Sequence, residues 1–298
     1  MKTGLEHCLL CPRRCGVNRL AGERGYCRAG ALAKAALVSL HKWEEPCLTG
    51  TLGAGTVFFS HCNLRCVFCQ NHEISQQGKG KEISTERLAG IFLEQQQRGA
   101  ATLDLVTPTH YVPQIVEALA TAKNKGFQLP VVYNSNAYEA VETIDLLRGY
   151  VDVFLPDLKY KDEASAVRYS AAPGYFAVAA AAIQQMLTIV GPPVFQGANL
   201  RRGVLVRHLV LPGKMKESMQ VVRWLWENFG NRVYLSLMNQ FTPLYRSAEY
   251  PEINRRLTTY EYQKVIDYAR ELGIDQCFIQ QGRTASKEFV PDFSGAGL

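Results

Sequence analysis

The sequence predicts an α/β protein whose parallel sheet and outer helices form a partial or complete barrel. From residue 56 onward, short apolar runs typical of strands alternate with segments at helical spacing. Seven candidate strands fit between residues 56 and 279, which favours a barrel over a short doubly wound sheet. No G-x-G-x-x-G pattern follows the first strand, which counts against a dinucleotide-binding fold.

Each element has a local signal in the sequence. Ser84 is a candidate N-cap, with Glu86 in the following turn and apolar residues at helical spacing after it. An alanine-rich helical stretch is interrupted by Gly-Pro-Pro at 191–193. The expected strands cover 56–60, 102–106, 131–133, 151–155, 204–211, 233–237 and 277–279. The other expected helices end at Gly126 and Gly149 or cover 215–229 and 259–272.

The chain divides into a cysteine-rich extension over residues 1–50, which has little periodicity, and a barrel domain over residues 51–298. Its composition, 47% hydrophobic and 20% charged, excludes a disordered chain. The longest purely apolar run, 176–183, is too short to span a membrane, and the N-terminus lacks the apolar segment of a signal peptide. We therefore expect a cytoplasmic protein without a membrane partner.

Two stretches concentrate the net charge of +6. The first thirty residues carry an excess of basic side chains, and the stretch from Arg201 to Lys216 contains no acid. Either could contact phosphates, a carboxylate ligand or an acidic protein. Neither carries a recognisable nucleic-acid module, so a solvated surface is favoured over nucleic-acid binding.

The nine cysteines are the most informative feature, because eight of them fall within the first 69 residues. The odd count and tight local spacing argue against a secreted disulfide framework. Cysteines two or three residues apart in a reducing compartment favour a metal ion or a cluster.

Cys62, Cys66 and Cys69 form a C-x3-C-x2-C pattern directly after the first expected strand. Three thiolates on one loop can hold three irons of a [4Fe–4S] cluster and leave the fourth iron open to a ligand. The alternative is a zinc knuckle that takes His61 or His72 as its fourth ligand.

This pattern at the end of the first strand resembles the signature of the radical S-adenosylmethionine (SAM) superfamily. Residues 55–71, 105–111, 155–160 and 206–213 resemble the pyruvate formate-lyase activating-enzyme branch, and within it the PflX-like proteins. The resemblance implies a partial (β/α)6-type barrel, a [4Fe–4S] cluster, and reductive cleavage of SAM to a 5′-deoxyadenosyl radical that abstracts hydrogen. It implies cofactor binding by Phe68, Asp157, Lys159 and Arg207, and Thr107 and Thr109 are further candidates at a place where this chain departs from the family.

Asp157 and Lys159 follow a strand, where barrel enzymes place their sites. The resemblance implies that the lysine binds the SAM carboxylate and the aspartate helps to hold a cation; the alternative is a simple turn. Strand alternation allows only one of Arg207 and His208 to point into the barrel. We expect Arg207 to point inward and His208 to be packed under the helices.

One departure from the superfamily concerns the SAM amino group. Most members carry Gly-Gly-Glu after the second strand, whereas this chain has Val106-Thr107-Pro108-Thr109-His110. Carbonyl and hydroxyl oxygens there could accept hydrogen bonds from the ammonium group.

A second cysteine group, Cys8, Cys11, Cys15 and Cys27, could form a closed zinc site or hold an auxiliary iron–sulfur cluster. The third interpretation is that these four cysteines are unpaired, buried thiols. Cys277 lies in an apolar strand, which indicates an inert core residue.

The expected partners are a flavodoxin- or ferredoxin-type electron donor and an acidic protein or peptide substrate. Two alternatives remain: a radical SAM enzyme that modifies a small molecule or RNA, and a zinc-stabilised scaffold without catalytic activity.

Overall fold

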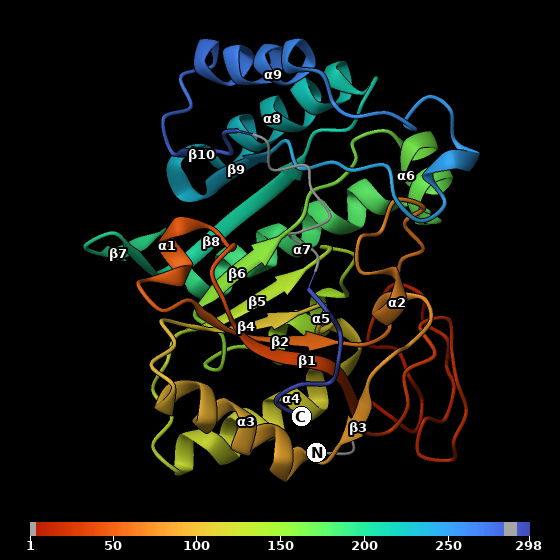
Figure 1. Ribbon diagram of the computed structural model, residues 1–298, viewed down its shortest axis with the longest axis vertical. Helices are drawn as coiled ribbons and strands as arrows, with labels where there is room; N and C mark the ends of the chain where they lie inside the picture. The colour runs from red at the N-terminus through yellow and green to blue at the C-terminus, as the bar shows by residue number, and fades with distance from the viewer. Residues whose placement is uncertain (1–3, 283–290) are drawn as a thin grey trace.

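The computed structural model describes residues 4–282 and 291–298 and forms one ten-stranded sheet (Figure 1). Its order is β10-β9-β8-β6-β5-β4-β2-β1-β3, with β7 paired to β8. Seven strands run parallel to their neighbours, and they are the seven strands expected from the sequence. They are β2 (Ala54–Phe59), β4 (Leu103–Val106), β5 (Val131–Ser135), β6 (Val153–Pro156), β8 (Asn199–Leu209), β9 (Tyr234–Met238) and β10 (Cys277–Ile279).

The sheet is open, because β3 (Lys81–Ile83) and β10 lie at its two ends and do not pair with each other. The mostly parallel, open sheet confirms the predicted α/β partial barrel. The carboxyl ends of its parallel strands meet at one edge of the sheet, where such folds place their sites.

Helices cover the outer face of the sheet and bury its main core. In α3, the Ser84 hydroxyl accepts a hydrogen bond from the Arg87 N–H, and Leu88, Ile91 and Phe92 are fully buried. Figure 1 shows α3 and α4 on one side of the sheet and α8 and α9 at the other end. The longer helices are α3 (Thr85–Gln97), α4 (Val112–Asn124), α6 (Glu163–Ser170), α7 (Tyr175–Val190), α8 (Met215–Phe229) and α9 (Thr259–Glu271), and the short ones are α1 (Pro46–Thr49), α2 (His72–Ser75) and α5 (Val141–Asp145).

The sequence did not indicate β1 (Ala33–His41), which lies within the weakly periodic residues 1–50 and pairs antiparallel with β2 and β3. The middle of β1 is buried on both faces, so it lacks the polar–apolar alternation that marks a half-buried strand. The antiparallel strands β3 and β7 (Val194–Gln196) were also not expected; both are only three residues long.

The two ends of the described chain pack against the barrel. Arg13 Nε donates to the Asn63 carbonyl over 3.0 Å, and the Arg13 guanidinium lies 3.9 Å from the Tyr26 ring centroid. The last residues return to β1, where the Gly295 N–H donates to the Ala36 carbonyl over 3.0 Å, and Phe293 packs edge-on against Phe58 of β2. Residues far apart in the sequence therefore frame the open barrel.

No single helix among the described residues is long and apolar enough to cross a membrane. The pair α6 and α7 reaches the required length and composition only when taken together, and it is bent by 95°.

Candidate active site

The cysteine loop, residues 62–69, follows β2 at the carboxyl edge of the sheet. Its Arg65 N–H donates to the Ser170 carbonyl over 3.0 Å. Its Val67 N–H donates to the Tyr169 carbonyl over 2.9 Å. The end of α6 thereby holds the loop in place through backbone contacts.

Each of the three sulfurs in the cysteine loop has a polar side-chain neighbour. Asn136 Nδ2 donates to Cys62 Sγ (3.4 Å), Ser170 Oγ donates to Cys66 Sγ (3.0 Å), and Ser75 Oγ lies 3.2 Å from Cys69 Sγ. Hydrogen bonds to sulfur favour the thiolate, the form that binds metal. These contacts fit cluster ligands better than inert core cysteines.

The charge state of these thiols depends on what they bind. Burial raises the pKa of Cys62 to about 12 and that of Cys69 to about 11, and it also raises the pKa of Cys66. Without a metal, all three therefore stay protonated at neutral pH. Among the described residues, no three His, Cys, Asp or Glu side chains surround a single-ion position. The loop accordingly fits a cluster, whose irons take one thiolate each, better than a zinc knuckle.

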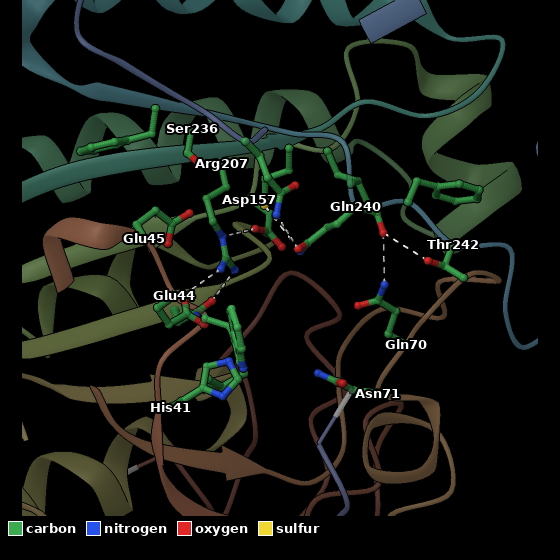
Figure 2. A pocket seen from close by; sticks show the side chains of 18 of the residues that line it. His41, Glu44, Glu45, Gln70, Asn71, Asp157, Arg207, Ser236, Gln240 and Thr242 are labelled. Atoms are coloured by element: carbon green, nitrogen blue, oxygen red, sulfur yellow. Dashed lines mark hydrogen bonds and ion pairs between the residues drawn. The ribbon is translucent and has the colours of Figure 1, made fainter. Parts of the chain in front are cut away.

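A cavity of about 610 Å³ lies inside the partial barrel, within the usual range for ligand pockets. Cys66, Phe68 and Cys69 line it near the cysteine loop, and Glu44 and Glu45 also line it. Figure 2 shows these two glutamates on the opposite side of Arg207 from Gln70 and Asn71, which follow Cys69. The cavity therefore has a cysteine end and an acidic end.

Asp157, Lys159 and Arg207 form one wall of the cavity. Lys159 Nζ lies 2.7 Å from Asp157 Oδ2, and Arg207 Nε lies 2.8 Å from Asp157 Oδ1. The backbone fixes this arrangement, because Asp157 forms a β-bridge with Arg207 at the end of β6. Arg207 also donates from Nη2 to Asn134 Oδ1 over 2.6 Å and pairs through Nη1 with Glu44 Oε2 over 3.3 Å.

The wall keeps its three charges despite burial. Burial alone would raise the pKa of Asp157, but Arg207 and Lys159 outweigh it and lower that pKa. Burial would lower the pKa of Lys159, but Asp157 and Cys66 raise it. The two cations share Asp157, and Arg207 has Glu44 as a second acidic partner, so Lys159 is the cation left less compensated and better able to bind a second anion.

The two neighbours on β8 point in the expected directions. Arg207 lines the cavity. His208 is 2% exposed, and its Nδ1 lies 2.7 Å from the Leu158 carbonyl on the helix-covered side. Burial lowers the pKa of His208 to about 4, so it is a neutral, packed residue.

Of the other predicted cofactor residues, Phe68 lines the cavity and the two threonines do not. The buried hydroxyl of Thr109 donates to Glu139 Oε1 over 2.6 Å. Thr107 has a positive φ of 59°, and its N–H donates to the Asn134 carbonyl over 2.9 Å. The contact of these two residues with the SAM amino group stays a prediction.

The four N-terminal cysteines come together around one small, separate cavity, together with Arg19 and His110. Arg19 is 1% exposed and donates from Nη1 to the His110 carbonyl over 2.7 Å. Burial raises the pKa of Cys11 to about 12 and also raises that of Cys27. The predicted grouping of Cys8, Cys11, Cys15 and Cys27 is thus present, and their sulfurs are not gathered around a single-ion position.

Sequence reasoning missed Glu44, Glu45, Asp104 and Asn134. A Glu-Glu pair before a proline is typical of an exposed turn, and an aspartate inside an apolar strand has no motif around it. We call Glu44, Glu45 and Asp104 the acidic floor. Burial raises the pKa of Asp104 to about 7, and burial followed by repulsion from Asp104 raises that of Glu44.

The second basic stretch does not form one surface. Arg201 and Arg202 are exposed near the start of β8, and Lys214 and Lys216 follow its far end. The seven residue steps from Arg202 to the end of β8 at Leu209 span roughly 23 Å, which separates the two pairs along the strand. Arg207 between them faces the cavity.

The cysteine loop, the cavity and the open parallel sheet together define a class of protein. Residues 56–185 match the family model of the radical SAM superfamily, and the chain belongs to this superfamily. Its members use a [4Fe–4S] cluster and SAM. The chain is also 32% identical over 283 residues to the uncharacterized protein MJ0674 of Methanocaldococcus jannaschii, covering 92% of this chain and 77% of the relative.

Two solved structures share the fold at low sequence identity. SuiB of Streptococcus suis, bound to the precursor peptide SuiA, gives a TM-score of 0.51 at 12% identity over 74% of this chain and 47% of SuiB. The FeFe-hydrogenase maturase HydG of Carboxydothermus hydrogenoformans gives 0.50 at 11% identity over 78% of this chain and 59% of HydG. This chain thus spans about half of each, and the likeness extends to the fold alone.

Proposed function

We propose that the protein is a cytoplasmic radical SAM enzyme of the pyruvate formate-lyase activating type, similar to the PflX-like proteins, that abstracts hydrogen from a protein or peptide. The observation that carries this proposal is a single cavity with Cys66 and Cys69 at one end and the Lys159–Asp157–Arg207 wall beside them. Nine free cysteines in the chain suit a reducing compartment.

In this proposal Cys62, Cys66 and Cys69 hold three irons of a [4Fe–4S] cluster. When bound and reduced, the cluster supplies the electron that cleaves SAM to methionine and a 5′-deoxyadenosyl radical. Lys159 and Arg207 bind the SAM carboxylate, since Asp157 orients both cations without neutralising them fully. Phe68 packs at 5.5 Å against Phe241 and shields this end of the cavity from water.

The electron donor is a flavodoxin- or ferredoxin-type protein that approaches the basic N-terminal extension, which packs against the cysteine loop. For the substrate we retain an acidic protein or peptide, whose flanks meet Lys214 and Lys216 beyond the carboxyl end of β8. A peptide is supported by analogy with SuiB, which shares the fold and was solved with a precursor peptide.

The four N-terminal cysteines hold a second centre, zinc or an auxiliary cluster, in this proposal. Their cavity is enclosed by Arg19 and His110 and is separate from the SAM cavity. The role of this centre is to stabilise the extension or to relay electrons.

The proposal is tested with single Cys→Ala variants at positions 62, 66 and 69. Each should abolish dithionite-dependent formation of 5′-deoxyadenosine, because three ligands are the minimum that holds the cluster. Cys277→Ala is the matched control, since this cysteine in β10 does not line the cavity. Retained SAM cleavage in any of the three loop variants would refute the assignment.

A further inference from the structure

The acidic floor lies at the opposite end of the barrel from the cysteine loop. His41 pairs with Ala54 at the start of β2, so the segment that carries Glu44 and Glu45 lies at the amino ends of the parallel strands. Asp104 is the second residue of β4 and shares a strand face with Val106, which lines the cavity. Carboxylates from two distant segments thus meet at the barrel's amino end.

Arg207 satisfies only one oxygen of this floor, because its Nη1 atom contacts Glu44. Its Nε and Nη2 atoms contact Asp157 and Asn134 instead. Among the described residues, Glu45 Oε2 and Asp104 Oδ1 have no hydrogen-bond partner, although Glu45 is only 8% and Asp104 only 1% exposed. A buried carboxylate oxygen without a partner costs stability, and a donor that enters the cavity would recover that cost at Glu45, which lines the cavity, with Asp104 buried behind the cavity wall.

The chemistry of the floor selects the kind of donor. An ionised carboxylate only accepts hydrogen bonds, and a cation bound beside Asp104, whose pKa burial raises to about 7, favours this ionised form. The floor therefore takes a cation rather than an anion. A metal ion fits poorly, because no three carboxylates or other ligands of the described chain surround one ion position. A primary ammonium group presents three donors that reach separate acceptors, which matches oxygens that are spread along a floor.

We propose that the acidic floor is a substrate subsite that binds a primary ammonium group, while the hydrogen to be abstracted lies toward the cysteine end of the same cavity. The position of the abstracted hydrogen rests on the proposed function, whereas the ammonium subsite does not. The ammonium group is carried either by a lysine side chain of a peptide or by a small free amine, and the same carboxylates would bind both.

The test is equilibrium dialysis with the cluster-containing, SAM-bound protein in the absence of reductant, so that no turnover occurs. One probe pair is a blocked Gly-Gly-Lys-Gly-Gly peptide and its norleucine counterpart; the other pair is pentylamine and pentanol. We expect the charged member of at least one pair to bind about tenfold more tightly, within the range for charge-assisted hydrogen bonds. The pair that shows the preference identifies the source of the ammonium group.

Glu45→Gln and Asp104→Asn should each remove this preference while leaving SAM affinity and cluster absorbance unchanged. Glu227→Gln, a matched charge loss at an exposed position on α8, should keep it. Either floor variant suffices if the other fails to fold. The inference falls if neither probe pair shows a preference, if the preference survives in a folded floor variant, or if SAM affinity drops in parallel. Failure of the wild-type protein to cleave SAM would refute the proposed function alone, because the dialysis needs no turnover.

Discussion

Asp157 is the residue on which the arrangement of the site depends, since its two carboxylate oxygens each hold one cation. Arg207 has Glu44 as a second acidic partner, whereas Lys159 shares Asp157 with Arg207. Lys159 is therefore the less compensated cation, which suits it to a carboxylate ligand, as the resemblance implied.

Lys159→Ala should weaken SAM binding by about tenfold or more, since a hydrogen bond to a charged group contributes ~1.5–3 kcal/mol. The cluster spectrum should stay unchanged, because Lys159 ligates nothing. Titration with SAM measures the effect, and Lys216→Ala, at an exposed position, is the control. Unaltered affinity in both Lys159→Ala and Arg207→Ala would show that the wall does not bind SAM.

Glu139 gives the fold a pH dependence of its own. Burial raises its pKa from 4.5 to about 7, although the Thr109 hydroxyl favours the charged form. The folded state therefore keeps a proton that the unfolded state releases, so the contribution of Glu139 to stability is fully present below pH 4.5 and is lost as pH rises through about 7. The loss is on the order of 3 kcal/mol.

Glu139→Gln should remove this loss. Anaerobic urea titrations at pH 5 and pH 8 should show a smaller drop in unfolding free energy for the variant than for the wild type. His110, whose pKa burial lowers to about 3, is common to both proteins and cancels in the comparison. Parallel pH profiles would contradict the assignment of Glu139 as a buried, protonated carboxyl group.

Among the elements, the N-terminal extension has the most to gain from a metal. Residues 4–32 contain no helix or strand, and four thiols line one enclosed cavity there. A segment with so little regular structure gains folding energy from a metal centre.

The double substitution Cys11→Ala, Cys15→Ala should therefore remove one metal centre and lower the unfolding temperature. Protein that folds should still cleave SAM, because the cysteine loop is untouched. Metal analysis of wild type and variant measures the loss, and the iron-to-zinc ratio distinguishes an auxiliary cluster from zinc. A wild-type protein with one four-iron cluster and no second metal would contradict this prediction.

At the scale of the whole molecule, charge is distributed unevenly along the barrel. The extension beside the cysteine loop exposes Arg14, Arg24 and Arg28, whereas Arg201 and Arg202 lie near the start of β8. An acidic electron donor should therefore approach the cysteine end by long-range attraction.

Reduction by a flavodoxin-type donor should slow by about tenfold between 50 and 500 mM salt, because salt screens charges on separate surfaces. Arg24→Gln with Arg28→Gln should reduce the rate at low salt, and Arg201→Gln with Arg202→Gln should not. Stopped-flow absorbance of the cluster measures both. Equal effects of the two pairs would place the donor elsewhere.

The sequence predicted all seven parallel strands and the orientation of Arg207, because periodicity is a local property. It missed β1, whose central residues are buried on both faces. It also missed the acidic floor, because Glu44 and Arg207 are 163 residues apart in the sequence and no local pattern at either position predicts their contact. Nor could the sequence show that the Thr109 hydroxyl donates to a buried glutamate 30 residues away.

The two unlike ends of the cavity have a consequence for regioselectivity. When the ammonium group of a substrate binds at Glu45, the carbon that reaches the cysteine end is set by its distance from that ammonium group. The barrel would then select the carbon to be activated by this distance and tolerate variation in the atoms between the two. Homologous amines that differ by one methylene should lose hydrogen from different carbons, each at the same distance from nitrogen.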